Sequence, residues 1–321
     1  MRLVNDIETL WLTTRDAALI LGVHESTVKR LCNDDVLPTR KTPGGHRRLA
    51  LASVLDWAER EKMQVPLTVF NGQAAQVWRA LQDAADGDFT PAAEISVHWL
   101  LGDKAHLFEP FIRLLYKDGR IEFPRLLDFL TAQVMHRIGE SWERGEIGVG
   151  QEHYSTQHLV DALHALRHDM PARNYGYTPP RAIVGCTEGE LHDLGALSVR
   201  LILEANGWLV DYLGANVPVS EFAVMQRRRK AELVCMSFVP PHGPADGHQA
   251  IRFLSQMYDS AAPYSLVLGG SGLGRGYTPP PGRHPFESLN VFSSLADLHG
   301  WLSRQSQARA VGEVRFRSVK D

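Results

Sequence analysis

The spacing of apolar residues divides the chain into three regions with different predicted architectures. Up to about Glu61, short segments with apolar residues at helical spacing alternate with turns. From about Ala74 to Met170 the helical spacing is interrupted only by short polar or glycine-containing segments, which predicts a bundle of four to five helices. After about residue 180, short β-branched runs alternate with helical segments. This alternation predicts a parallel sheet with right-handed crossovers.

The C-terminal region contains five predicted strands, identified by their apolar and β-branched composition. They have the sequences RAIVGCT, WLVDYLG, ELVCMSFV, SLVLGGSG and LNVFSS. The last predicted helix, LADLHGWLSRQ, is followed by a polar tail over residues 306–321 that we expect to be loose. The segment 62–73, between the first two regions, is predicted to be a linker.

The N-terminal region predicts two short helices followed by a tight turn. Residues 13–23 form the first helix, which ends at Gly22, and residues 24–36 contain the second. The Pro-Gly-Gly sequence at 43–45 requires a tight turn, and another short helix is expected from Ser53. Two short helices joined by a glycine-containing turn are typical of a helix-turn-helix.

The net charge of the whole chain, −3 at pH 7, does not indicate nucleic-acid binding, so any DNA contact must come from a local patch. Between Lys29 and Arg48, six basic residues are opposed only by Asp34 and Asp35. The second helix would enter the major groove, and the turn would form a wing that reaches phosphates or the minor groove. A solvated basic turn on a helical hairpin has the same charge pattern. The residues predicted to contact DNA are Ser26, Thr27, Lys29, Arg30, Arg40, Lys41, His46, Arg47 and Arg48.

The string TTRDAALILGVHESTVKRLCNDDVLPTRKTPGGHRRL resembles the MerR family of winged-helix regulators over about residues 11–60. The TPGGHRR segment corresponds to the wing of that group and of its excisionase relatives. The resemblance implies binding to double-stranded DNA as an oligomer. MerR-like proteins usually dimerise through a C-terminal coiled coil, but this chain has no sustained heptads, so we expect another part of it to form the oligomer.

A candidate ligand site lies in Glu190-Leu191-His192-Asp193-Leu194-Gly195, between a predicted strand and a predicted helix. The carboxyl ends of parallel strands are where open α/β folds bind ligands. His192 could ligate a metal through one ring nitrogen, while Glu190 accepts a hydrogen bond from the other and fixes the tautomer. An ordinary surface-loop histidine is the alternative.

Two later strands end in residues that extend this site. Ser237 follows His192 by 45 positions and the pair Gly269-Gly270 follows it by 77, so all three lie at one edge of the predicted sheet. Glycines at such an edge let a bulky ligand approach the backbone.

This set resembles the cobalamin-binding fold of methionine synthase and the corrinoid mutases, whose pattern is Asp-x-His-x-x-Gly, Ser-x-Leu and Gly-Gly. Glu190 stands in place of the Asp and Val239 in place of the Leu. The resemblance implies base-off cobalamin with His192 as the lower cobalt ligand and a nucleotide tail near Ser237. The implied binding residues are Glu190, His192, Asp193, Gly195, Ser237, Val239, Gly269 and Gly270.

The order of the three regions resembles the CarH- and CarA-type repressors of carotenoid genes. Trp142, followed ten and eleven positions later by Glu152 and His153, matches the spacing with which that group caps the upper face of cobalamin. The resemblance implies an adenosylcobalamin-bound tetramer that blocks an operator in the dark, and a photoreceptor that releases DNA in light. In that group a His follows the Trp, whereas this chain has Glu143. A light-independent cobalamin sensor therefore stays an alternative.

Other classes fit less of the sequence. A heme-sensing regulator could use His192, and a corrinoid methyltransferase or mutase component could use the whole C-terminal region. The chain lacks the roughly 250 residues of a TIM barrel that such chemistry usually requires, so we expect no enzyme activity. His164 and His168 share a helix face, but no third metal ligand at a fitting spacing accompanies them.

The remaining composition favours a cytoplasmic protein. The three cysteines form no C-x-x-C pair, and the N-terminus carries acidic residues without a signal-length apolar segment. No stretch approaches the roughly 18 apolar residues of a membrane span. The predicted fold class is multidomain α and α/β, with a winged helix-turn-helix at 1–62, a helical bundle at 74–172, a Rossmann-like (flavodoxin-like) cobalamin-binding domain at 180–305 and the tail at 306–321.

Overall fold

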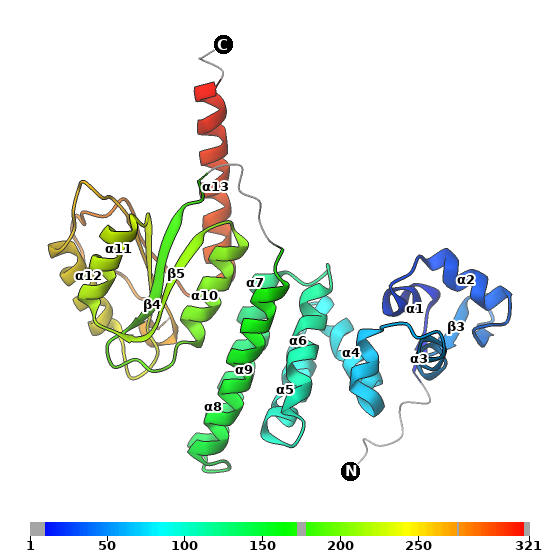
Figure 1. Ribbon diagram of the computed structural model, residues 1–321. Coiled ribbons are helices and arrows are strands. Elements are labelled where there is room, and N and C mark those ends of the chain that lie inside the picture. Colours follow the sequence, from blue (N-terminus) through cyan, green and yellow to red (C-terminus); the bar gives the residue numbers. More distant parts are fainter. Residues whose placement is uncertain (1–9, 172–177, 275, 318–321) are drawn as a thin grey trace. The chain divides into compact units, whose positions relative to one another are not determined.

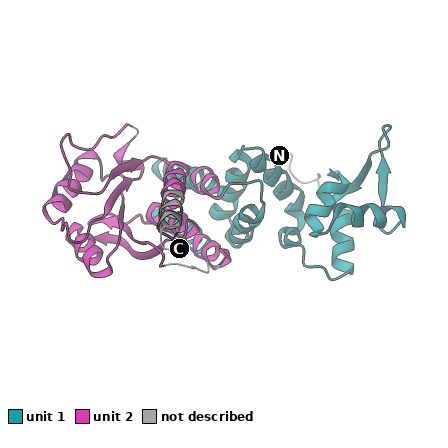
Figure 2. Cartoon of the chain, turned by 90° about the horizontal axis from the view of Figure 1, so that it is seen from above, with its two compact units in different colours: residues 1–122, 130–162 teal, residues 123–129, 163–321 magenta. Residues whose placement is uncertain are grey.

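A computed structural model of the chain describes residues 10–171, 178–274 and 276–317. The chain divides into two compact units (Figure 2), of residues 1–122 with 130–162, and of residues 123–129 with 163–321. The predicted bundle domain is therefore shared between the two units, and the second boundary falls inside helix α9 (Val149–Asp169).

The first unit begins with the predicted winged helix. Thr13 caps the first helix in a capping box with Asp16, and Gly22 ends it with a φ of 66°, a conformation that favours glycine. A short strand before this helix was not predicted. The elements are β1 (Trp11–Leu12), α1 (Thr14–Leu21), α2 (Glu25–Asn33), β2 (Thr39–Lys41), β3 (Arg47–Ala50) and α3 (Leu51–Arg60).

Strand β3 is the centre of an antiparallel sheet with the order β1-β3-β2. The predicted turn at 43–45 joins β2 to β3, and Gly45 takes a φ of 79°. Helix α3 starts at Leu51 instead of Ser53, because Leu51 and Val54 are both fully buried against the sheet and the first helix.

The helices that follow confirm the helical spacing of the second region. They are η2 (Pro66–Gln73), α4 (Ala74–Ala85), α5 (Thr90–Leu101), η3 (Ala105–Leu107), α6 (Phe108–Lys117) and α8 (Ala132–Glu143), with the start of α9. The predicted linker is wrong over residues 66–73. This segment forms η2, because Phe70 is buried and stacks on Trp99 at 5.8 Å between ring centroids, and Gln73 accepts a hydrogen bond of 2.6 Å from the same indole.

The second unit is an α/β domain with a five-stranded parallel sheet of order β5-β4-β6-β7-β8 (Figure 1). Helices α10 and α13 pack together on one face, and α11 and α12 lie on the other. The strands are β4 (Arg181–Thr187), β5 (Leu209–Val217), β6 (Leu233–Ser237), β7 (Ser265–Gly269) and β8 (Leu289–Phe292). The helices are α10 (Leu194–Ala205), α11 (Val219–Arg229), α12 (Pro244–Gln256), η5 (Ser271–Leu273) and α13 (Leu295–Arg317), and residues 123–129 add α7 (Phe123–Arg125) and the start of the π-helical η4 (Leu126–Thr131).

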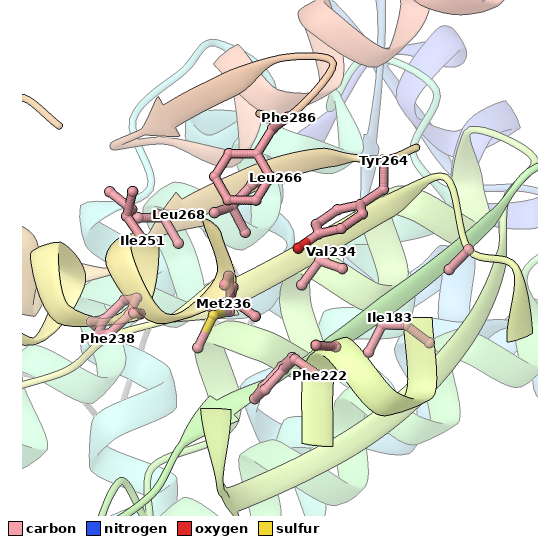
Figure 3. Close-up of a cluster of buried hydrophobic side chains, with 14 of the residues drawn as sticks. Ile183, Phe222, Val234, Met236, Phe238, Ile251, Tyr264, Leu266, Leu268 and Phe286 are labelled. Carbon is pink, nitrogen blue, oxygen red and sulfur yellow. The ribbon is translucent and has the colours of Figure 1, made fainter. Parts of the chain in front are cut away.

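If the five strands are numbered along the chain, their order across the sheet is second, first, third, fourth and fifth, which is the flavodoxin-like arrangement. A core of large side chains lies between this sheet and helices α11 and α12 (Figure 3), with Phe222, Phe238 and Leu266 fully buried. Burying each such side chain contributes about 1.5–3 kcal/mol. The strand ends that carry the candidate site are therefore held on a rigid base.

The expected loose tail is wrong at its start. Helix α13 continues to Arg317, and residues 306–317 include two alanines and three arginines, which favour helix. Helix α12 begins with Pro244 in its first turn, and the Asp246 carboxylate accepts a bond from Gly243 N–H at 2.7 Å. None of the helices in the described ranges is long and apolar enough to cross a membrane.

Candidate functional site

The segment between β4 and α10, residues 188–193, is called the His192 loop here. It leaves the sheet where β4 pairs on one side with β5 and on the other with β6. The chain order reverses at this point, where the loops after β4 and β6 lead to helices on opposite faces of the sheet, the position at which open α/β folds bind ligands. Cys186, near the end of β4, pairs in register with Ser237, the last residue of β6. The structure thus brings His192 and Ser237 to the same edge, as predicted.

The carboxylate of Glu190 organises the His192 loop. Its side chain is 1% exposed, and its Oε1 accepts hydrogen bonds from both the backbone N–H and Nδ1 of His192, each at 2.9 Å. Its Oε2 accepts from the backbone N–H of Val239, also at 2.9 Å. These bonds fix the imidazole with its proton on Nδ1, which leaves Nε2 as the basic nitrogen.

The free edge of the His192 ring is accessible. Its side chain is 58% exposed, and no residue in the described ranges forms a hydrogen bond with Nε2. An imidazole oriented by a buried carboxylate, with its second nitrogen free, is a ready metal ligand. A single such ligand fits a metal held in a macrocycle, which brings its own equatorial donors, so the residues present fit a corrinoid. In the described part of the chain, no three His, Cys, Asp or Glu residues gather as a metal site, and His164 and His168 gain no third ligand.

The predicted Ser237 and glycine positions are close-packed. A Cβ on Gly195 would lie 2.9 Å from Ser237 Oγ, and that hydroxyl has no hydrogen-bond partner among the described residues. A Cβ on Gly270 would lie 2.2 Å from the carbonyl oxygen of Phe238, and one on Gly269 would lie 2.8 Å from that of Phe292. Glycine is therefore required at 269 and 270 by the packing of neighbouring strand ends. That a ligand approaches there stays a prediction.

The opposite end of the His192 loop is fixed by residues that sequence reasoning missed. The Tyr212 hydroxyl, on β5, donates to Asp193 Oδ2 at 2.9 Å, while its ring lies 5.2 Å from the Arg200 guanidinium. Burial, followed by the nearby carboxylates of Asp193 and Glu190, raises the pKa of the Cys186 thiol to about 12. Cys186 thus stays a thiol at neutral pH and does not compete with His192 for a metal.

Leu191 is a further residue with an unusual setting. It is 71% exposed, more than any other large apolar side chain in the described ranges, and it stands beside His192. An exposed apolar side chain at a candidate site supplies surface that a bulky ligand can cover. Its apolar character within a polar loop was the signal in the sequence.

The predicted cap residues of the bundle lie in the first unit. Trp142, near the end of α8, is 48% exposed. Glu152 accepts hydrogen bonds from Thr156 Oγ1 at 2.8 Å and from His153 Nδ1 at 2.5 Å. The structure thus joins Glu152 and His153 on the first turns of α9 and leaves the Trp142 indole accessible. Contact of all three with cobalamin stays a prediction, as does a role for the exposed Glu143.

The predicted recognition helix is α2. Ser26, Lys29 and Arg30 are exposed on it, whereas Thr27 is half-buried. Lys29 pairs with Glu25 at 3.0 Å, and His24 caps the helix start by accepting a hydrogen bond from the Ser26 backbone N–H at 3.2 Å. Exposed residues at the start of such a helix are those that reach base edges in the major groove.

The wing separates its basic residues onto two faces. Arg40 pairs in register with Arg48 and Lys41 with Arg47, so each pair lies on one face of the hairpin. The Arg47 face is that of the buried Leu49, and the Arg47 guanidinium donates to Asn33 Oδ1 at 2.5 Å. On the other face, the Arg40 guanidinium lies 4.8 Å from the ring centroid of Trp11. His46 is exposed at the hairpin turn.

Three family models match separate parts of the chain. Residues 11–62 match a family described as a helix-turn-helix domain, residues 180–272 match a B12 binding domain, and residues 111–167 match a second family described as a B12 binding domain. The repressor CarA of Myxococcus xanthus is 30% identical over 129 residues, 40% of this chain and 43% of that protein. The repressor CarH of the same organism is 24% identical over 247 residues, 74% of this chain and 80% of that protein.

Corrinoid proteins share the C-terminal architecture. The dimethylamine corrinoid protein of Methanosarcina barkeri is 24% identical over 119 residues, which are 37% of this chain and 56% of that protein. This chain therefore spans less than two thirds of the length of that protein and of CarA. The solved structure of the monomethylamine corrinoid protein of the same organism superposes with a TM-score of 0.50 at 16% identity, over 64% of this chain and 93% of that one, which shows the fold. The chain therefore joins a helix-turn-helix domain to B12-binding domains. The one at residues 180–272 has the Rossmann-like fold of corrinoid proteins.

Proposed function

We propose that the chain is a cobalamin-dependent transcriptional repressor, which binds operator DNA as an adenosylcobalamin-loaded oligomer and leaves the DNA after illumination. The observation that carries the proposal is the buried Glu190 carboxylate, which orients His192 and leaves its Nε2 free at the edge of the sheet. The winged helix in the same chain supports regulation over catalysis, because a methyltransferase or mutase component has no use for it.

In this proposal His192 Nε2 is the lower cobalt ligand. Leu191 packs against the macrocycle, and the Ser237 hydroxyl, which lacks a protein partner among the described residues, receives the nucleotide tail beside Gly195. Trp142, Glu152 and His153 contact the upper face. The chemistry that bound adenosylcobalamin supplies is a cobalt–carbon bond that light cleaves.

DNA binding in this proposal uses two surfaces of the first unit. Ser26, Lys29 and Arg30 of α2 face base edges, and the wing contacts phosphates. An oligomer joins several such domains, so its affinity for an operator far exceeds that of one domain. Loss of the oligomer is then sufficient to release DNA.

A second candidate function is a cobalamin sensor that does not respond to light. It is favoured by the exposed Glu143, which stands where CarH-type repressors carry a histidine. A carboxylate is a poorer cobalt partner than an imidazole. The two candidates share the lower site and differ only in what illumination does.

The lower site is tested by titrating the full chain with adenosylcobalamin and hydroxocobalamin, using absorption spectra as the readout. His192→Ala should abolish tight binding of both corrinoids, because it removes the only proposed protein ligand to cobalt. His164→Ala is the matched control, since His164 is an exposed histidine of the same unit, on α9. Unchanged corrinoid affinity in His192→Ala would overturn the proposal, and preferential binding of heme would favour a heme-sensing regulator instead.

A further inference from the structure

Asn216, near the end of strand β5, has a backbone conformation that few residues adopt. Its φ is 55°, in the left-handed region where Asn and Gly are favoured over other residues. The position belongs to the edge strand of the sheet and lies outside the His192 loop, Ser237 and the Gly269-Gly270 pair. Its conformation is therefore explained by local contacts.

The reason lies in the pairing of β5 with β4. Val184 pairs with Tyr212, Gly185 with Gly214 and Thr187 with Val217, so β5 carries one extra residue in each of two successive steps. Such bulges bend an edge strand and re-aim its side chains, and they are frequent next to functional sites. Here they turn Asn216 toward the His192 loop.

Asn216 holds the His192 loop through two hydrogen bonds. Its side-chain Oδ1 accepts from the backbone N–H of Gly189 at 2.8 Å, and its own backbone N–H donates to the carbonyl oxygen of Glu190 at 2.8 Å. Both partners precede His192 in the loop, by three and two positions. Because the Glu190 carboxylate orients the His192 ring, a shift of the Glu190 backbone would move the imidazole as well.

The opposite side of the loop is closed by the segment after β6. Glu190 Oε2 accepts from Val239 N–H, and a Cβ on Gly189 would lie only 3.2 Å from the His242 ring. The loop thus leaves little room for a larger residue at 189 beside His242 on one side, and it is bonded to Asn216 on the other. Without the Asn216 side chain, Gly189 would lose its restraint on the β5 side.

We propose that Asn216 is a positioning residue, which sets the direction of His192 Nε2 through Gly189 and Glu190 and so tunes ligation of a corrinoid cobalt. The proposal rests on the proposed function of the His192 loop. The edge strand β5 thereby has a role in cofactor binding, although it lies outside the His192 motif in the sequence.

The decisive variant is Asn216→Gly. Glycine adopts the left-handed conformation without strain and keeps the backbone N–H to Glu190, so the substitution deletes only the acceptor for Gly189. Lys230→Gly is the matched control, because Lys230 caps α11 with a φ of 53° and its side chain is exposed. Full-length native chain, both variants and His192→Ala are titrated with hydroxocobalamin, with affinity, absorption spectrum and thermal unfolding of the apoprotein as readouts.

We expect Asn216→Gly to weaken hydroxocobalamin binding about tenfold and to alter the spectrum of bound corrin, as loss of an outer-shell partner typically does. Lys230→Gly should bind hydroxocobalamin like the native chain. The apoproteins of Asn216→Gly and Lys230→Gly should have the unfolding temperature of the native apoprotein. Native affinity and spectrum in Asn216→Gly, with His192→Ala defective, would overturn this inference and leave the proposed function intact. Equal weakening by both glycine variants would also overturn it. Native affinity in His192→Ala would instead remove the proposed function.

Discussion

Glu190 is the one charged side chain that is almost fully buried among the residues the structure describes. Burying a carboxylate without partners costs several kcal/mol, and three N–H donors offset that cost here. Two of the donors belong to His192 and the third, from Val239, comes from the loop after β6. One buried carboxylate therefore joins the two loops that meet at the reversal of strand order, and it orients the imidazole at the same time.

Glu190→Gln tests this double role in the apoprotein. A glutamine has one acceptor oxygen, so its NH₂ group would face either the Val239 N–H or the His192 donors. Leaving a buried donor unpaired costs about 1–3 kcal/mol. We expect a lower urea midpoint of unfolding for Glu190→Gln, while Glu188→Gln, an exposed neighbour in the same loop, should leave the midpoint unchanged. Equal midpoints for the two variants would contradict a structural role for this carboxylate.

At the residue scale, the residues of the His192 motif could be predicted from the sequence, but the residues that hydrogen-bond to the His192 loop from β5 could not. Glu190, His192 and Ser237 could be predicted because their spacing follows from strand and helix lengths, which are regular. Tyr212 and Asn216 could not be predicted. Tyr212 is the last regularly paired residue before the first bulge of β5, Asn216 lies within the second, and the bulges leave no periodic signal. For Gly270 the structure adds a reason for glycine that was not predicted, close packing against Phe238, while room for a ligand stays a prediction.

At the scale of elements, the strand alternation of the wing is the informative feature. Arg40 and Arg48 lie on the face away from the buried Leu49, while Arg47 is bonded to Asn33 at the end of α2. The six basic residues that the sequence groups into one patch therefore do not act alike. A count of charges could not separate them, because the separation depends on the register of β2 with β3.

The wing prediction follows from this separation. Each phosphate contact adds about 0.9 to the slope of log affinity against log salt. Arg48→Ala should lower the slope on a random-sequence duplex by about one, without changing thermal unfolding. Arg47→Ala should leave the slope unchanged and lower the unfolding temperature, because it breaks the bond between the wing and α2. A reduced slope in Arg47→Ala with native unfolding would mean that Arg47 contacts phosphate.

The second region shows why element boundaries were harder to predict than element types. The helices of the bundle follow their apolar spacing, but η2 was predicted to be a linker because Pro66 and Gly72 are typical of loops. Burial of Leu67 and Phe70 outweighs those signals. Helix α13 was predicted to end too early, because its apolar periodicity weakens after residue 305 although the helix continues to Arg317.

At the scale of the whole molecule, helix α9 belongs to both compact units. Its first turns carry Glu152 and His153 in the first unit, and its last turns lie in the second unit with the His192 loop. Arg167, near its end, pairs with Glu204 of α10 at 2.6 Å. Sequence periodicity assigned the whole helix to the bundle, because contacts between distant segments have no periodic signature. Helix α9 is thus continuous across the boundary between the two units.

The proposed light response is tested on the whole molecule, and Glu143 makes the test specific. We expect the adenosylcobalamin-loaded chain to elute from a size-exclusion column as an oligomer in the dark and as smaller species after green light. Both proteins keep His192 as the proposed lower ligand, so both should retain corrin after illumination. Because a carboxylate holds cobalt less well than an imidazole, Glu143→His should release the photolysed corrin more slowly than the native chain, as followed by absorption across the eluted peaks. Hydroxocobalamin-loaded protein, whose size should not respond to light, is the control. Bound corrin with no change in size in either protein would favour the light-independent sensor, because cofactor binding would then be uncoupled from illumination.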